Sequence, residues 1–200
     1  MKEPFVFFFM GFSGSGKDTQ AELLKDLLEK RDGRDSVLWI STGDILRDIV
    51  DKKNYAGRVI DQKIMRAGEP APSFLVTFLW AETAVRELKE SQHVIFPSSP
   101  RSLEEAQSLD EFAVFFDRRK VFPILLEVGR KEAFQRLTSR ARKDDTPEII
   151  NHRLDYFERQ VRPAVEYFEK ESENKLVKID GNPNDVQKIH ENILKAAGLM

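Results

Sequence analysis

Five short apolar runs alternate with amphipathic stretches along the chain. The first, at residues 5–10, is continuous and rich in aromatic residues, which predicts a strand that is buried on both faces. Four more strands are expected, at residues 37–40, 93–96, 121–128 and 176–179. Between them, apolar residues recur at steps of three and four, which predicts helices. The first predicted helix follows the first strand. The other predicted helices cover residues 45–53, 57–67, 73–90, 102–117, 131–140, 145–170 and 185–197.

This alternation of strands and helices indicates an α/β fold with a five-stranded parallel sheet and helices on both faces. The 200 residues fit one domain, and no internal repeat or linker is visible. We expect the 145–170 helix to bend near Pro163, since proline cannot donate the helical hydrogen bond. Ligands of such sheets bind beyond the carboxyl ends of the strands.

Composition narrows the possible functions. With 32 basic and 34 acidic residues the net charge is −2, so no nucleic-acid or membrane partner is expected. The chain has no cysteine, which excludes disulfides, thiol catalysis and thiolate zinc sites. Its histidines are far apart in sequence, so a histidine-built metal site is not expected. The longest apolar run is too short to span a bilayer, and a cytoplasmic location is expected by default.

The segment between the first strand and its helix carries the clearest motif. Residues 11–17 read Gly-Phe-Ser-Gly-Ser-Gly-Lys and match the phosphate-binding pattern G-x-x-x-x-G-K. Small residues let backbone N–H groups converge on phosphate oxygens, and the helix N-terminus adds a favourable dipole. Lys17 adds a positive charge for the β- and γ-phosphates. The next residue in the pattern is usually Ser or Thr, whereas here it is Asp18, with Thr19 following.

The loop and several later motifs resemble those of adenylate kinases. Residues 11–20 are similar to G-x-P-G-S-G-K-G-T-Q, and Ser41–Arg47 (S-T-G-D-I-L-R) is similar to the family's acceptor-site motif. The remaining matches, in the family's order, are residues 68–76, 100–106, 142–148 with Arg153-Leu154, and 179–181. The resemblance covers essentially the whole chain.

The resemblance implies a P-loop nucleoside monophosphate kinase that catalyses ATP + AMP = 2 ADP. It implies a core (1–40, 74–135 and 146–200), a helical monophosphate-binding insert (about 41–73) and a very short lid (about 136–145). It further implies Mg²⁺ and ATP as cofactors, free nucleotides as the only partners, and a monomer. Two alternatives remain open: a kinase for another monophosphate such as GMP, and a nucleotide-binding sensor without turnover.

The family's functional residues carry over by position. The catalytic set is Lys17, Arg101, Arg136, Arg142 and Arg153. The ATP-binding set is Ser13, Gly14, Ser15, Gly16, Lys17, Asp18, Thr19, Arg136 and Pro183. The AMP-binding set is Thr42, Arg47, Met65, Ala71 (through its backbone), Arg101 and Glu105. Thr19 and Asp44 are the expected metal residues, Asp44 through water.

Three features of the sequence depart from the family pattern. Pro97-Ser98 replaces the Asp-Gly whose aspartate helps to order hydrated magnesium, which leaves Asp44 as the nearest acidic candidate. Only Ala141 separates Arg140 from Arg142, so the lid is a minimal turn without a zinc site. Glu105 replaces a glutamine that faces the acceptor base. An ionised carboxylate only accepts hydrogen bonds, so Glu105 would meet adenine N1 unfavourably and would suit the donors of guanine. Because the rest of the acceptor motif resembles that of adenylate kinases, we still expect AMP as acceptor, with weakened discrimination against GMP.

Overall fold

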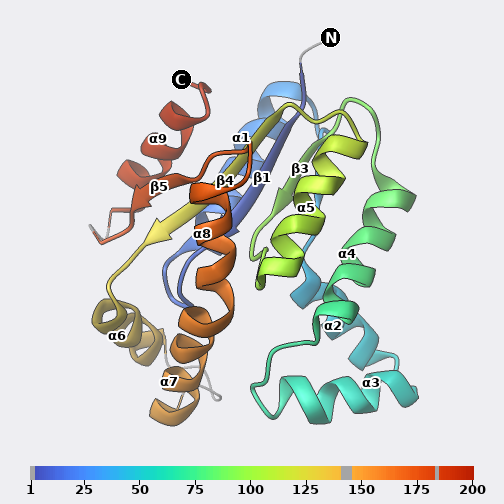
Figure 1. The fold of residues 1–200 in the computed structure, drawn as a ribbon, viewed down its shortest axis with the longest axis vertical. Coiled ribbons are helices and arrows are strands. Elements are labelled where there is room, and N and C mark those ends of the chain that lie inside the picture. Colours follow the sequence, from blue (N-terminus) through green and yellow to red (C-terminus); the bar gives the residue numbers. More distant parts are fainter. Residues whose placement is uncertain (1–2, 141–145, 183–184) are drawn as a thin grey trace.

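The structure is a computed structural model, which describes residues 3–140, 146–182 and 185–200. Its centre is a parallel sheet in the order β2-β3-β1-β4-β5 (Figure 1). The strands are β1 (Phe5–Met10), β2 (Val37–Trp39), β3 (His93–Phe96), β4 (Lys120–Glu127) and β5 (Val177–Asp180). The predicted α/β fold and all five predicted strands are confirmed. No helix in the described ranges has the length and hydropathy needed to cross a membrane.

The middle strand, β1, is buried on both faces, as its unbroken apolar run predicts. Phe5, Phe7 and Phe9 point to a core that is covered by α1 (Lys17–Asp32) and α9 (Val186–Ala196). Val6, Phe8 and Met10 point to the opposite core. The helices on that side are α4 (Ser73–Glu87), α5 (Leu103–Phe115), α6 (Arg130–Arg140), α7 (Pro147–Tyr156) and α8 (Arg162–Lys170). The strand that precedes the glycine loop is therefore fixed from both sides.

Residues between β2 and α4 form a small helical unit with its own apolar contacts. It contains α2 (Thr42–Asp51), α3 (Tyr55–Ile60) and a π-helical turn at Asp61–Met65. Leu46, Ile60 and Leu79 form a separate buried cluster that joins this unit to α4. The helix predicted over 57–67 starts earlier, because the Asn54 side chain accepts a hydrogen bond from the backbone N–H of Gly57.

The long helix predicted over 145–170 is divided into α7, a π-helical turn (Phe157–Val161) and α8. Thr146 caps α7, and Pro147 follows it at the first turn. The π-helical turn ends one residue before Arg162-Pro163, where proline has no N–H to continue the α-helical ladder. The interruption predicted near Pro163 is thus a change of helix type just before the proline. This turn also carries Phe157 to the cavity described next.

Candidate active site

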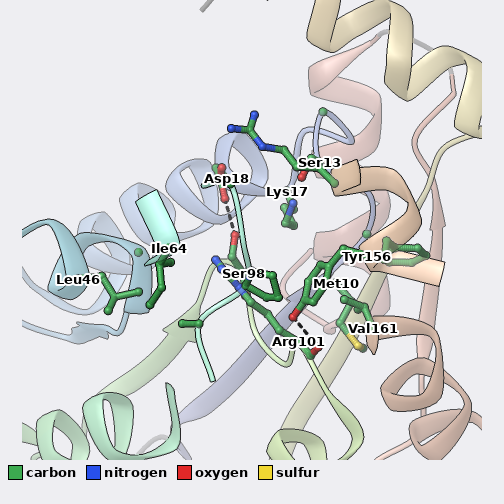
Figure 2. Close-up of a pocket in the computed structure, with 18 of the residues that line it drawn as sticks. Met10, Ser13, Lys17, Asp18, Leu46, Ile64, Ser98, Arg101, Tyr156 and Val161 are labelled. Atoms are coloured by element: carbon green, nitrogen blue, oxygen red, sulfur yellow. Dashed lines mark hydrogen bonds between the residues drawn. The ribbon is translucent and has the colours of Figure 1, made fainter. Parts of the chain in front are cut away.

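A cavity of about 370 Å³ lies where β1 and β3 end. Its walls come from the glycine loop after β1, from α2 and the π-helical turn near Met65, and from residues 68–71. The segment after β3, α6, and the α7–α8 region complete it. Figure 2 shows Lys17 and Arg101 on this cavity, with Leu46 and Ile64 of the helical unit on another side. Elements distant in sequence therefore meet at the sheet edge where ligands of such folds bind.

The glycine loop adopts a backbone conformation that other residues rarely take. Gly11, Gly14 and Gly16 have φ values of 145°, 83° and 92°. At Gly14 a Cβ atom would lie 2.9 Å from Leu137 Cγ, so the loop packs directly against α6. Gly16 is the N-cap of α1 and makes no side-chain capping bond. The first amides of α1 therefore receive no bond from an N-cap side chain, an arrangement that suits an anion such as phosphate.

Lys17 follows this loop and lines the cavity. Its Nζ donates a hydrogen bond of 3.3 Å to the backbone oxygen of Phe12. Burial lowers the pKa of Lys17, Asp18 opposes that shift, and the positive charges of Arg101 and Arg140 add to it. A phosphate group placed here would relieve this unfavourable positive charge, so the lysine is poised to bind an anion.

Arg101 faces the same cavity from the segment between β3 and α5. Its Nε donates a hydrogen bond of 2.9 Å to the backbone oxygen of Ser98. The Tyr156 hydroxyl of α7 donates one of 3.0 Å to the backbone oxygen of Arg101. Burial raises the pKa of Tyr156 to about 12, so this hydroxyl keeps its proton. Arg101 is therefore fixed in place by contacts from two separate elements.

Glu105 lies behind Arg101 and is not among the residues that line the cavity. Only 1% of it is exposed, and its Oε2 accepts a hydrogen bond of 2.6 Å from the backbone N–H of Arg101. Burial raises the pKa of Glu105, whereas the hydrogen bonds from Arg101 and Ser99 and the Arg101 charge oppose that shift. In this arrangement the carboxylate contacts the arginine backbone, not the cavity where a base would lie.

Arg136 of α6 also turns away from the cavity lining. Its Nη2 donates hydrogen bonds to the backbone oxygens of Gly181 (2.9 Å) and Asn182 (3.2 Å), and its Nε donates to Glu132. The Asn182 side chain in turn accepts a hydrogen bond from the N–H of Gly129. These bonds tie the loop after β5 to α6 and to the end of β4.

The other expected site residues divide into three groups. Those that line the cavity, besides Lys17 and Arg101, are Ser13, Gly14, Asp18, Arg47, Met65, Ala71 and Arg153. Those that do not, besides Glu105 and Arg136, are Ser15, Gly16, Thr19, Thr42 and Asp44. Arg142 and Pro183 lie outside the described residues.

The expected metal residues, Thr19 and Asp44, do not line the cavity that Lys17 faces. The Asp44 carboxylate forms an ion pair with Arg47. Burial acts to raise the pKa of Asp44, but hydrogen bonds with Ser41 and Arg47 outweigh it and lower that pKa. Neither Asp44 nor Thr19 is among the lining residues. The Asp18 carboxylate does line the cavity, and Asp18 is both the direct sequence neighbour of Lys17 and a charge that raises the pKa of that lysine.

Several lining residues were not predicted as site residues. Arg140 and Tyr156 line the cavity from α6 and α7, and Ser98 lines it from the end of β3. Glu69 lies 3.5 Å from His152 Nε2, so the 68–71 segment contacts α7 there. Their sequence context gave little signal, although Arg140 stands one helical turn after Arg136 and so faces the same general direction.

Comparison with known proteins agrees with this geometry. The family model for adenylate kinase matches residues 9–173. The chain is 31% identical over 192 residues to an adenylate kinase of Prochlorococcus marinus (strain MIT 9211), covering 96% of each chain. It is 34% identical over 182 residues to an adenylate kinase of Thermus thermophilus, covering 89% of this chain and 90% of the relative. The glycine loop, the cationic cavity and these similarities together show that the chain belongs to the adenylate kinase family.

Proposed function

We propose that this chain transfers the terminal phosphoryl group of ATP to AMP and so forms two molecules of ADP. The observation that carries the proposal is one cavity that is lined both by a phosphate-binding loop and by two arginines from other segments. Lys17 lines it from the loop side, Arg47 from α2 of the helical unit, and Arg101 from the segment between β3 and α5. A reaction between two phosphate esters requires this pairing of a donor site with an acceptor site.

The donor half is assigned to the glycine loop and α1. Backbone N–H groups of residues 13–19 would hold the phosphates of ATP, and Lys17 would follow the charge of the group in transfer. Arg136 would act on the donor side by holding the loop after β5, where Gly181 and Asn182 accept its hydrogen bonds. For Pro183, the assignment to the ATP site rests on the resemblance.

The acceptor half is assigned to the helical unit and the segment after β3. Arg47 and Arg101 would bind the phosphate of AMP, while Met65 and Ala71 line the wall where its base would lie. Thr42 is 3% exposed and would act on the base from behind this wall. We assign residues 41–73 to this acceptor insert, because the cluster of Leu46, Ile60 and Leu79 gives it a core of its own.

Transfer itself needs alignment and positive charge, because the acceptor is an anion and requires no strong base. Lys17, Arg101 and Arg153 line the cavity and would stabilise charge on the moving phosphoryl group, with Arg142 of the short lid (136–145) joining them. Carboxylate and hydroxyl oxygens among the lining residues fit a hard cation such as Mg²⁺. When bound with ATP, Mg²⁺ neutralises phosphate charge and polarises the reacting group.

The residues that we assign to the two nucleotides all come from one chain, which supports a monomer as the active form. We place this monomer in the cytoplasm, with free nucleotides as its partners. A coupled assay with ATP and, in turn, AMP, GMP, CMP and UMP tests the function. We expect AMP to be the best acceptor. Turnover with GMP alone would instead identify a guanylate-specific kinase, and nucleotide binding without any turnover would identify a sensor.

A further inference from the structure

The cavity places one carboxylate directly beside the phosphate-binding lysine. Asp18 follows Lys17 in the first turn of α1 and lines the cavity with it. Only one other carboxylate, that of Glu69, is found among the described lining residues, and it lies near His152 on the acceptor side. Asp18 is therefore the acid that a triphosphate held by the glycine loop would meet first.

A carboxylate at this position is unfavourable for binding bare ATP. ATP and Asp18 are both anionic, and like charges a few ångströms apart repel. An acid in the first helical turn gains only a small favourable interaction with the helix dipole at an exposed site. A cation placed between the carboxylate and the phosphates would turn this repulsion into attraction on both sides.

Ser98, in the turn that follows β3, adds a second side-chain oxygen beside Asp18. Its hydroxyl donates a hydrogen bond of 2.9 Å to Asp18 Oδ1, and both side chains line the cavity (Figure 2). Ser98 is in turn placed by Arg101, whose Nε donates to its backbone oxygen. Pro97, the residue that directly follows β3, has no side-chain oxygen. The Asp18–Ser98 pair thus joins the first turn of α1 to the turn after β3.

The chemistry of this pair matches a divalent cation that is shared with a nucleotide. Mg²⁺ prefers hard oxygen ligands and keeps several waters, so it needs only one or two carboxylates besides substrate phosphates. In the phosphate-loop pattern, the residue after the lysine is the one whose side-chain oxygen meets the metal. Asp18 occupies that position with a full negative charge.

We propose that Asp18, held by Ser98, is the side chain that binds the Mg²⁺ of MgATP, directly or through a coordinated water. This assignment rests on the proposed donor site for ATP. It moves the metal role away from Asp44, whose carboxylate is paired with Arg47 and lies outside the cavity lining. It also explains how the chain orders a cation without an acidic residue at position 97.

The test is calorimetric binding of β,γ-methylene-ATP, a non-hydrolysable analogue, in the presence of either excess Mg²⁺ or EDTA. For the unmodified protein we expect Mg²⁺ to tighten binding. For Asp18→Asn we expect that tightening to shrink by roughly 10–100-fold, as for other metal-positioning changes. Binding in EDTA should be unchanged or tighter, because the repulsion between carboxylate and phosphate is gone. Ser98→Ala should shrink the Mg²⁺ effect less, since it removes only the partner of Asp18.

Matched variants separate this role from a structural one. Asp26→Asn removes the same charge from an exposed position of α1 outside the cavity lining, and should keep the full Mg²⁺ effect. Asp18→Ser restores a hydroxyl at this position and should recover part of it. Electron paramagnetic resonance with Mn²⁺ and the analogue gives a second measure, and should show weaker Mn²⁺ binding for Asp18→Asn.

Three results would overturn the assignment of Asp18, and a fourth would overturn the donor site on which it rests. Equal loss of affinity with and without Mg²⁺ in Asp18→Asn would show that Asp18 only shapes the loop. An unchanged Mg²⁺ effect in that variant, with analogue binding intact, would show that the metal lies elsewhere. Loss of the effect in Asp44→Asn alone would assign the metal to Asp44. If the unmodified protein bound no analogue in either condition, the proposed donor site itself would be wrong, and the assignment would fall with it.

Discussion

Glu105 shows how one buried side chain can change the expected chemistry of a site. Its carboxylate bonds to the Arg101 backbone, and it is absent from the cavity lining. From that place we expect Glu105 to act on the acceptor through Arg101, as a positioning residue, without touching the base. We then expect the base to be selected by residues that line the proposed acceptor wall, such as Met65 and Ala71.

Replacement of Glu105 by glutamine tests this directly. If the side chain read the base, Glu105→Gln would raise kcat/KM for AMP relative to GMP, because glutamine can both donate and accept. From the observed contacts we expect the AMP-to-GMP ratio to stay within about twofold, since glutamine can still accept from the Arg101 N–H. Steady-state kinetics with both acceptors on both proteins decides between the two, and a tenfold change in the ratio would return Glu105 to the base site.

Lys17→Ala should lower kcat on the order of 10³-fold, because it removes a charge that stabilises the phosphoryl group in transfer. Thermal stability should hold or rise slightly, since burial already disfavours the charged lysine. The measurements are a coupled assay and a melting curve, with Lys30→Ala, on the exposed end of the same helix, as control. Near-normal turnover of the Lys17 variant would disprove the donor-site assignment.

The start of β3 carries a histidine that links three elements. His93 Nδ1 accepts a hydrogen bond of 2.9 Å from the N–H of Phe5 in β1, and its Nε2 lies 3.0 Å from Asp32 at the end of α1. The ring must therefore be neutral, with its proton on Nε2. A second proton on Nδ1 would break the bond to Phe5, so this junction is sensitive to acid.

We expect the free energy of unfolding to fall as the pH drops below 6.5, the ordinary pKa of histidine. Burial lowers the pKa of His93 in the folded protein, against the effect of Asp32, so the unfolded chain binds the proton more readily. His93→Asn keeps an acceptor for Phe5 and cannot be protonated there. Urea unfolding between pH 5 and 8 (roughly the range in which histidine titrates) should show a weaker pH slope for this variant. Equal slopes would refute the role of His93.

The sheet was predictable because its signal is local. The four strands before β5 each contain a short apolar run, and β1 is apolar throughout because both of its faces are covered. Helix types were less predictable. The π-helical turns at Asp61–Met65 and Phe157–Val161 depend on one extra residue per turn, which the spacing of apolar residues does not reveal.

The sequence predicts which segments form the site, but it does not predict the hydrogen bonds between their side chains and backbone. The glycine loop and Arg101 follow strand ends, so topology alone brings them together. The bond from Tyr156 to Arg101 joins residues 55 positions apart, and no motif marks it. The direction of Glu105 also depends on tertiary structure, because the sequence places it four residues after Arg101 without showing which way its carboxylate turns.

The cavity spans from the glycine loop to the helical insert, so one ligand should be able to fill both halves. We expect a compound with two adenosines joined by five phosphates to raise the melting temperature more than ATP and AMP together at equal concentration. One linked ligand loses its freedom of motion once instead of twice. At a concentration of 100 times its Kd, such a ligand adds about 2.7 kcal/mol to the free energy of unfolding.

A variant of the acceptor side supplies the control for that measurement. Arg47→Ala should reduce stabilisation by the linked compound while leaving stabilisation by ATP alone unchanged, because we assign Arg47, which lines the cavity from α2, to the acceptor half. If the linked compound stabilised the protein no more than ATP does, the two halves would not be occupied together, and the assignment of Arg47 and Arg101 to the acceptor would fail.

The short bond from the Arg101 N–H to Glu105 has a spectroscopic consequence. The backbone nitrogen of Arg101 lies 2.6 Å from Oε2 of the buried Glu105 carboxylate. A hydrogen bond this short shifts the resonance of the amide proton strongly downfield, and burial slows the exchange of that proton with solvent. In a ¹⁵N-labelled sample, its resonance should stand apart at the downfield edge of the amide spectrum. Because Arg101 lines the cavity, that single isolated signal would follow nucleotide binding at the acceptor side without any attached probe.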